Sequence, residues 1–308
     1  MTRALCVGHA VQDFVFSTPQ LPQRAEKHRA TGFSIVGGGP AATAAVAIAK
    51  LGGHASLVAR VGNDVIADAI QRELEDYGVD CRHLRRFPGF QSSVSAVFVD
   101  AQGERLIVNH TDASLPTDPS WLESAVSLEG IDVVLADTRW PDGAIAMLKR
   151  ARAAGLPAVL DADVPVPKTG SLLQSATHVA FSMAGLKDYS GCSDAMTDIE
   201  SALRQTAISL KAWCCVTMGA SGVLIADARF EQSNVTARTV PAYPVKPVDT
   251  LGAGDVWHGA FALALAEGAD EMAAVRAASA AAAIKVTRLG GRAGAPTRVE
   301  RDSLLESK

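Results

Sequence analysis

The chain has 308 residues, of which 48% are hydrophobic and 20% are charged, and its formal net charge at pH 7 is −4. This length can bury one large α/β core, and the composition is that of an ordinary globular protein. The mildly acidic balance supplies no reason to bind nucleic acid or an anionic membrane, so any anionic ligand must be held by local groups. The N-terminal segment lacks the apolar core of a signal peptide, and the five cysteines show no metal-ligand spacing, so we expect a cytoplasmic protein.

Apolar runs, helical periodicity and turn residues predict the order of the elements. In the first half we expect strands at 4–7, 10–16 and 30–36, a helix at 40–51, a strand at 55–61, a helix at 64–77, and a hairpin at 93–100 and 105–109. In the second half we expect strands at 133–136, 158–160, 178–181 and 213–217, helices at 143–154, 198–210, 253–267 and 271–286, and a hairpin at 222–226 and 230–235. Strands that alternate with helices imply parallel βαβ units, so the predicted class is α/β, with one domain spanning 1–308.

The most informative segment is 248–255, which reads VDTLGAGD and runs directly into an apolar helical pattern. Backbone N–H groups at a helix start are unpaired and lie at the positive end of the helix dipole, so they attract anions. Asp255 at the same turn can accept a proton from a hydroxyl group. An anion cradle beside a base is what phosphoryl transfer to an alcohol requires. A simple helix N-cap by Asp255 explains the local pattern equally well.

This segment resembles the signature of the ribokinase-like sugar kinases, the PfkB family, which usually reads Asp-Thr-x-Gly-Ala-Gly-Asp before an apolar helix. The family's other motif, a glycine pair that opens a helix of small residues, is matched by Gly37, Gly38 and Gly39 followed by PAATAA. Both motifs occur in the family's order and separation, and the resemblance covers essentially the whole chain. It implies a mainly parallel central sheet flanked by helices, with excursions at about 10–36 and 92–112 forming a small β-sheet lid that often pairs with a second subunit's lid.

The resemblance also implies roles for individual residues in an ATP-dependent kinase. Asp255 would be the general base, and the N–H groups of Gly252, Ala253 and Gly254 would form the anion hole. The nucleotide is expected along Thr217, Gly219, Ser221 and Gly222, with Ala278 and Ser279 near the base. A plain glycine-rich turn is the alternative interpretation of the segment 215–222, and the chain contains no Walker-type phosphate loop.

The cations are less well defined by the resemblance. Many family members carry an Asn-x-x-Glu motif that organises Mg²⁺, but the matching stretch 182–185 reads SMAG. Magnesium must still accompany ATP, and its protein ligands remain unassigned, with Asp161 and Asp163 as candidates and solvated loop carboxylates as an equal alternative. The resemblance further suggests a monovalent cation, such as K⁺, bound by carbonyl groups near Asp249 and Leu251. His258, one helical turn after Asp255, is explained as well by packing as by chemistry.

The residues expected to bind the sugar suggest an anionic substrate. The resemblance assigns Asp13 to two sugar hydroxyls. Lys27, Asn109 and Arg139 are each expected as surface groups when taken alone, but together they could hold an anionic end. Four strings, GGGPAATAAVA, VLADTRW, AFSMAGL and KVTRLGGRAG, resemble the 6-deoxy-6-sulfofructose kinase branch, in which the matching residues hold the sulfonate.

The implied reaction is phosphorylation of 6-deoxy-6-sulfofructose to its 1-phosphate by ATP, a step of sulfoquinovose breakdown, in a homodimer paired through the lid. A kinase for fructose, ribose, ketodeoxygluconate or a sugar phosphate remains an alternative. A catalytically silent regulator that binds sugar or nucleotide is a further alternative of a different class. Neither nucleic acid nor a membrane is expected as a partner.

Overall fold

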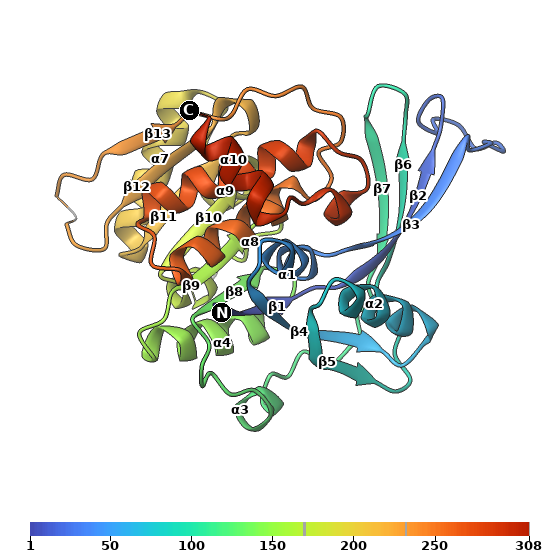
Figure 1. Ribbon diagram of the computed structural model, residues 1–308, viewed down its shortest axis with the longest axis horizontal. Coiled ribbons are helices and arrows are strands. Elements are labelled where there is room, and N and C mark those ends of the chain that lie inside the picture. Colours follow the sequence, from blue (N-terminus) through green and yellow to red (C-terminus); the bar gives the residue numbers. More distant parts are fainter. Residues whose placement is uncertain (169–170, 232, 308) are drawn as a thin grey trace.

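Two β-sheets organise the residues described by the computed structural model, which are 1–168, 171–231 and 233–307. In this part of the chain the larger sheet has nine strands, and a four-stranded sheet stands beside one end of it (Figure 1). In spatial order the large sheet contains β13 (Ala237–Val240), β12 (Val223–Asp227), β11 (Trp213–Thr217), β10 (His178–Ser182), β9 (Ala158–Ala162), β8 (Val133–Asp137), β1 (Arg3–Gly8), β4 (His54–Gly62) and β5 (Asp80–Phe87). The strands from β11 to β5 pair in parallel, which confirms the predicted α/β class.

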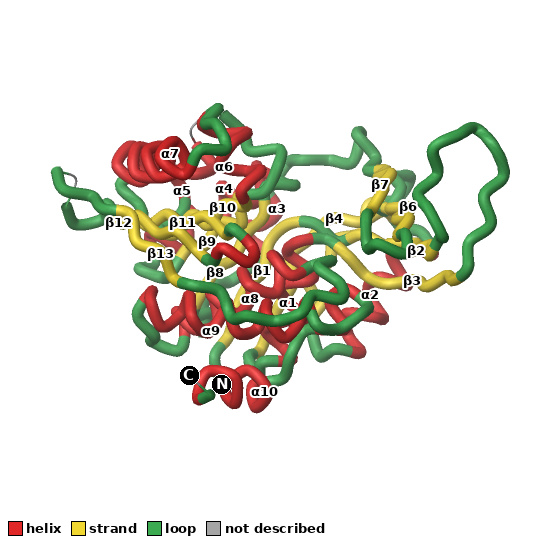
Figure 2. The backbone as a smooth tube through the Cα atoms, turned by 90° about the horizontal axis from the view of Figure 1, so that it is seen from above, coloured by secondary structure: helices red, strands yellow, loops and turns green. Residues whose placement is uncertain are grey.

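Helices cover both faces of the large sheet (Figure 2). They are α1 (Pro40–Lys50), α2 (Val65–Asp76), α3 (Trp121–Ala125), α4 (Pro141–Ala153), α5 (Ser171–Ser175), α6 (Met183–Ser190), α7 (Met196–Leu210), α8 (Ala253–Ala266), α9 (Glu271–Val286) and α10 (Arg298–Glu306), with short 3-10 turns η1 (Gly219–Ser221) and η2 (Gly291–Gly294). One hydrophobic cluster joins α1, α8 and α9 to the sheet, and a second joins α4 and α7 to its other face. Cys215 belongs to the first cluster and Cys214 to the second, because neighbouring side chains of a strand point to opposite faces.

The small sheet is built from the two excursions that the sequence predicts. Its strands, in spatial order, are β3 (Gly32–Gly38), β2 (Val11–Ser17), β6 (Val94–Val99) and β7 (Arg105–His110). We call this sheet the lid. Because side chains alternate along each strand, its registers place Asp13, Ser95 and Asn109 on one face. Most of the large apolar side chains of the lid lie on the opposite face.

The structure differs from the sequence prediction mainly at the edges of the large sheet. The sequence does not predict β5, because its four basic side chains obscure the alternation of a half-buried strand, and charges are common on edge strands. The predicted strand at 230–235 is wrong: residue 232 lies outside the described residues, and the other five are not in a strand. The strand β13 pairs with β12 in its place. The short helices α3, α5 and α6 and the C-terminal α10 are also absent from the prediction.

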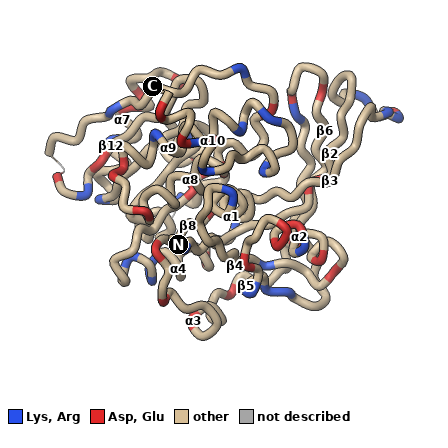
Figure 3. The backbone as a smooth tube through the Cα atoms, viewed as in Figure 1, with Lys and Arg blue, Asp and Glu red and all other residues tan. Residues whose placement is uncertain are grey.

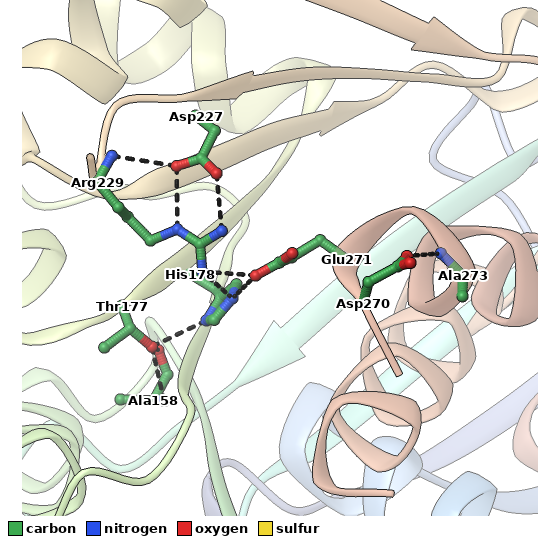
Figure 4. Close-up of polar contacts among 8 residues, drawn as sticks. All are labelled: Ala158, Thr177, His178, Asp227, Arg229, Asp270, Glu271 and Ala273. Atoms are coloured by element: carbon green, nitrogen blue, oxygen red, sulfur yellow. Dashed lines mark hydrogen bonds and ion pairs between the residues drawn. The ribbon is translucent and has the colours of Figure 1, made fainter. Parts of the chain in front are cut away.

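A polar network fixes the start of α9 against the sheet (Figure 4). The guanidinium of Arg229 donates to Asp227 at 2.7 Å and to Glu271 at 2.5 Å, and Nε2 of His178 lies 3.5 Å from Glu271. The hydrogen bond from His178 and the Arg229 guanidinium hold the pKa of Glu271 below its usual value. Glu271 is the first residue of α9, where a negative charge also complements the helix dipole. The network therefore positions α9, whose other end approaches the site described below.

Charged side chains of both signs are interleaved along the described trace (Figure 3). In the parts of the chain that the structure covers, no helix is both long enough and apolar enough to cross a bilayer.

Candidate active site

The glycine-rich turn before α8 opens a backbone anion site. Gly252 caps the helix in the left-handed region, with φ of 73°, and α8 begins at Ala253. A Cβ added at Gly254 would meet no atom within 4 Å, so the space above this residue is open to a ligand. The N–H of Ala253 already donates to the carbonyl of Thr250 at 3.2 Å. The geometry therefore favours Gly252 and Gly254 over Ala253 as donors to an anion.

Asp255 lies in the first turn of α8, beside these amide groups. Burial, followed by the charge of nearby Asp161, raises the pKa of the Asp255 carboxyl to about 7. The charge of His258 acts in the opposite direction. A carboxylate whose pKa lies near the operating pH is well suited to general-base catalysis.

Three further aspartates gather at the carboxyl ends of β8 and β9, which α8 packs against. Asp137 ends β8 and accepts hydrogen bonds from the backbone N–H groups of His9 (2.8 Å), Ala41 (3.0 Å) and Arg139 (2.8 Å). It thereby joins the end of β1 to the start of α1. Ligands commonly bind at this edge of a parallel sheet.

Asp161 lies inside β9 and is buried, which corrects the alternative of a solvated loop carboxylate for this residue. Its Oδ2 is 3.3 Å from Nδ1 of His258, while Oδ1 is buried without a hydrogen-bond partner among the described residues. Asp163 follows β9, accepts from the Ser182 hydroxyl at 2.6 Å, and pairs with Arg139 at 3.2 Å. Ser182, which stands where the Asn-x-x-Glu motif would begin, therefore hydrogen-bonds to Asp163 and helps to fix that carboxylate.

The glycines before α1 make room for charged side chains. A Cβ at Gly38 would overlap the Asp13 carboxylate, and one at Gly37 would overlap the guanidinium of Arg292. Arg292 is 1% exposed, pairs with Glu73 at 3.0 Å, and has no hydrogen-bond partner for Nη1 among the described residues. Burial raises the pKa of Asp13, and the charge of Arg292 partly offsets this. Arg292 is not among the site residues predicted from the sequence, and its only signal there is the string KVTRLGGRAG.

The lid contributes a polar row that faces the site. Asn109 stands opposite Ser95, and Ser95 stands opposite Asp13. The amide of Asn109 donates to the Ser95 hydroxyl at 3.1 Å. The structure thus brings Asp13 and Asn109 together through Ser95, which the sequence analysis also missed. It does not place Lys27 with them, because Lys27 is exposed beside Gln20 and His28 in the long loop between β2 and β3. This loop extends outward from the lid (Figure 2).

Comparison with known proteins matches residues 1–298 to the pfkB family carbohydrate kinases. The chain belongs to this family. It is 31% identical over 306 residues to the ribokinase of Bacillus subtilis (strain 168), covering 98% of this chain and 99% of the relative. A putative ribokinase from Agrobacterium tumefaciens is 36% identical, with a TM-score of 0.88 and coverage of 99% and 98% of the two chains. The ribokinase of Arabidopsis thaliana, solved in complex with ribose and ATP, is 26% identical, with a TM-score of 0.84 and coverage of 99% and 98%.

Membership shows that this protein is an ATP-dependent sugar kinase with the ribokinase-like fold, including the smaller second sheet. The intact Asp255 and glycine turn give no support to the alternative of a silent regulator.

The segment expected to bind the nucleotide follows the carboxyl end of β11. Thr217 ends the strand, residues 219–221 form η1, and Gly222 has φ of 90°. A Cβ at Gly222 would overlap the carbonyl of Val240. On α9, Ala278 is fully buried in the core, and the Ser279 hydroxyl accepts from Trp257 Nε1 at 3.3 Å. The expected position of these two residues near the base stays a prediction.

The position expected for a monovalent cation is filled by protein donors. The ammonium of Lys285 donates to the carbonyl of Asp249 at 2.7 Å, and the N–H of Leu251 donates to the Asp249 carboxylate at 2.8 Å. The Asp249 carbonyl and carboxylate therefore already accept hydrogen bonds, and the expected binding of a cation by carbonyl groups near Asp249 and Leu251 stays a prediction.

Proposed function

We propose that this kinase phosphorylates the 1-hydroxyl of an anionic ketose, 6-deoxy-6-sulfofructose, as a step of sulfoquinovose breakdown. The observation that carries the proposal is the row Asp13, Ser95 and Asn109 on the site-facing side of the lid. Neighbouring strands lie about 4.8 Å apart, so the row spans roughly 10 Å. This length suits a six-carbon sugar whose hydroxyl groups contact Asp13 while its anionic end reaches Asn109.

Two arginine side chains supply positive charge near the site. The guanidinium of Arg292 lies buried against Gly37, and Arg139 is half-exposed at the end of β8, where it faces Asp163. A planar guanidinium offers paired donors that match an oxyanion such as a sulfonate. Because the whole chain is acidic, these local charges are what would distinguish an anionic sugar from a neutral one.

In the proposed reaction the Asp255 carboxylate takes the proton of the sugar hydroxyl. The hydroxyl oxygen forms a bond to the γ-phosphorus of ATP, and the bond from that phosphorus to the β–γ bridging oxygen breaks, releasing ADP. The N–H groups of Gly252 and Gly254 stabilise the charge on the transferring group. The pKa of Asp255 near 7 leaves a large fraction ionised at neutral pH.

Magnesium is proposed to accompany ATP and to neutralise charge on its phosphates. No three His, Cys, Asp or Glu side chains in the described parts of the chain form a complete cage. Mg²⁺ usually needs only one or two carboxylates together with phosphate oxygens and water. Asp161, with its unpartnered buried oxygen, and Asp163 beside it fit that requirement.

Ribose is the second candidate, favoured by 31% identity to a ribokinase over nearly the whole chain. Fructose remains a further neutral alternative. The decisive experiment compares ADP formation from ATP with sulfofructose, fructose, ribose and fructose 6-phosphate under identical conditions. The proposal expects the highest kcat/KM for sulfofructose; a higher value for ribose or fructose would overturn it.

A charge reversal tests whether the substrate is recognised as an anion. Arg139→Glu is expected to raise KM for sulfofructose about tenfold or more, equivalent to about 1.4 kcal/mol, and to change KM for fructose little. Lys149→Glu, an exposed change on the following helix α4, is the matched control and should affect neither sugar. Lys27→Ala and Asn109→Ala in the same assay test the other two residues that the resemblance assigns.

We also propose that the kinase forms a homodimer through the lid. On the face turned away from the site, Phe33, Ile35 and Val108 are 57%, 55% and 60% exposed. Apolar side chains clustered in this way commonly mark an interface. Sedimentation should show a dimer that Ile35→Glu dissociates, while Val299→Glu, at an exposed apolar residue of α10, leaves it intact.

A further inference from the structure

Lys285, in the last turn of α9, buries a charged group completely. Its side chain is 0% exposed, and burial lowers the pKa of its ammonium while Asp249 opposes that effect. The ammonium donates to the Asp249 carbonyl at 2.7 Å, to the Asp249 carboxylate at 3.0 Å, and to the Arg288 carbonyl at 3.4 Å. An ammonium has three N–H donors, so each one has an oxygen partner.

The oxygens around this group are already saturated with donors. Oδ1 of Asp249 accepts from the N–H of Leu251 at 2.8 Å, and Oδ2 accepts from those of Gly290 at 3.1 Å and Gly291 at 3.2 Å. The carbonyl of Val286 accepts from the N–H groups of Val248 at 2.6 Å and Asp249 at 3.0 Å. A metal ion needs oxygens that are free of donors, so this arrangement does not fit K⁺.

The charges around Asp249 also disfavour a bound metal cation. Arg105, on the lid strand β7, lies 3.6 Å from Oδ1 of Asp249 and hydrogen-bonds to Thr250. Asp249 therefore faces two cationic side chains, and a further cation would be repelled by both. The carboxylate of Asp255 is also near enough to favour the charged form of Lys285, although it is not the largest influence.

The ammonium supports the backbone that holds the transferring phosphoryl group. Asp249 lies three residues before Gly252, and its carboxylate binds the intervening Leu251. The loop 290–292 packs against the same turn, because a Cβ at Gly291 would lie 3.5 Å from Leu251, and one at Gly252 would lie 3.9 Å from the N atom of Arg292. A positive charge on the protein side of this turn adds to the helix dipole, and both stabilise negative charge on the ligand side.

We propose that the ammonium of Lys285 replaces the monovalent cation beneath the anion hole, so that the kinase carries this cation as part of its own chain. Lys285 is a positioning residue, since it acts on the transferred group through Asp249 and the turn that follows. The competing explanation is an ordinary buried ion pair that stabilises the fold without affecting catalysis. The two explanations differ in their response to added salts.

The experiment measures kcat, KM and melting temperature in choline chloride, KCl and NH₄Cl at equal ionic strength. ADP is quantified directly by chromatography, so that no cation-dependent coupling enzyme is present. The wild-type enzyme should show the same kcat within twofold in all three salts. Stimulation of the wild type by KCl of fivefold or more would overturn the proposal, whatever the variants do.

Lys285→Ala removes the ammonium and frees the carbonyl oxygens of Asp249 and Arg288. Its kcat should fall tenfold or more in choline chloride and recover threefold or more in NH₄Cl or KCl, with a higher melting temperature in those salts. Lys50→Ala is the control, because Nζ of Lys50 donates to the nearby Ala293 carbonyl at 2.6 Å from a partly exposed position. It should give a small effect that is equal in the three salts.

A loss of activity in Lys285→Ala that is equal in every salt, with no shift in melting, would identify Lys285 as a structural ion pair only. If Lys285→Ala does not fold, Lys285→Met keeps the apolar stem of the side chain and is tested in the same series. The wild-type salt series still decides the main claim.

Discussion

The imidazole Nδ1 of His258 lies 3.3 Å from Oδ2 of Asp161, and both side chains are buried. His258 follows Asp255 by one turn of α8, and Asp161 lies in β9. The other ring nitrogen, Nε2, is 3.3 Å from the carbonyl of Ala180 and is placed to donate to it. Burial lowers the pKa of His258 and raises that of Asp161, so without a bound cation both effects favour the uncharged forms of the two groups. The geometry gives Nδ1 no hydrogen-bond partner among the described residues.

A neutral pair predicts different results for two substitutions of similar volume. Asp161→Asn keeps a neutral polar group beside Nδ1 and should leave the free energy of unfolding nearly unchanged. Asp161→Leu removes the polar atoms beside the buried Nδ1 and should destabilise the fold by about 1–3 kcal/mol. Urea unfolding at pH 7 measures both. Equal losses in the two variants would show instead that the native pair is ionised.

Asp255 should control the pH dependence of turnover. The base is active as a carboxylate, so kcat/KM is expected to rise with pH and to reach half its maximum near the pKa of about 7. Asp255→Asn should fold normally and lose about 10²-fold or more in kcat. A folded variant with near wild-type turnover, or a profile that is flat between pH 6 and 8, would contradict the assignment.

The same carboxyl should affect stability with the opposite trend. Its folded pKa lies above its unfolded value of 3.8, so the native state binds more protons between about pH 4 and 7. The contribution of Asp255 to the free energy of unfolding is therefore fully present below pH 4 and is lost as pH rises toward 7. Asp255→Asn should therefore raise the melting temperature above that of the wild type, and this increase should be several degrees larger at pH 8 than at pH 5. Calorimetry at the two pH values measures it.

Two glycines of the nucleotide segment should differ in their tolerance of alanine. Gly222, with φ of 90°, has no room for a Cβ beside the Val240 carbonyl, so Gly222→Ala should cost about 2–4 kcal/mol and raise KM for ATP. Gly219 has φ of 57°, and a Cβ added there would meet no atom within 4 Å. Gly219→Ala should therefore cost only about 1 kcal/mol of folding stability. Thermal unfolding measures the loss of stability in each variant, and titration with ATP measures the change in KM. Similar losses at both positions would show that close packing at Gly222 is unimportant.

Sequence by itself determined the features that depend on neighbours along the chain. The turn at 252–254 and the apolar pattern after it place Asp255 at a helix start, because capping and periodicity act within a few residues. The alternation of strands and helices determined the parallel sheet, and the hairpin signal located β6 and β7. The charged edge strand β5 escaped this approach, since its pairing with β4 depends on position in the sheet.

Only the tertiary structure decided which distant residues meet. Lys285 and Asp249 are 36 residues apart, and Arg292 and Glu73 are 219 apart, yet each pair shares a buried contact. The order of strands and the packing of α9 bring these groups together, and neither leaves a periodic signal in the sequence. Burial, which decides that Lys285 is a fixed cation and Lys27 an exposed one, is a property of the folded chain because it depends on every element packed around the side chain.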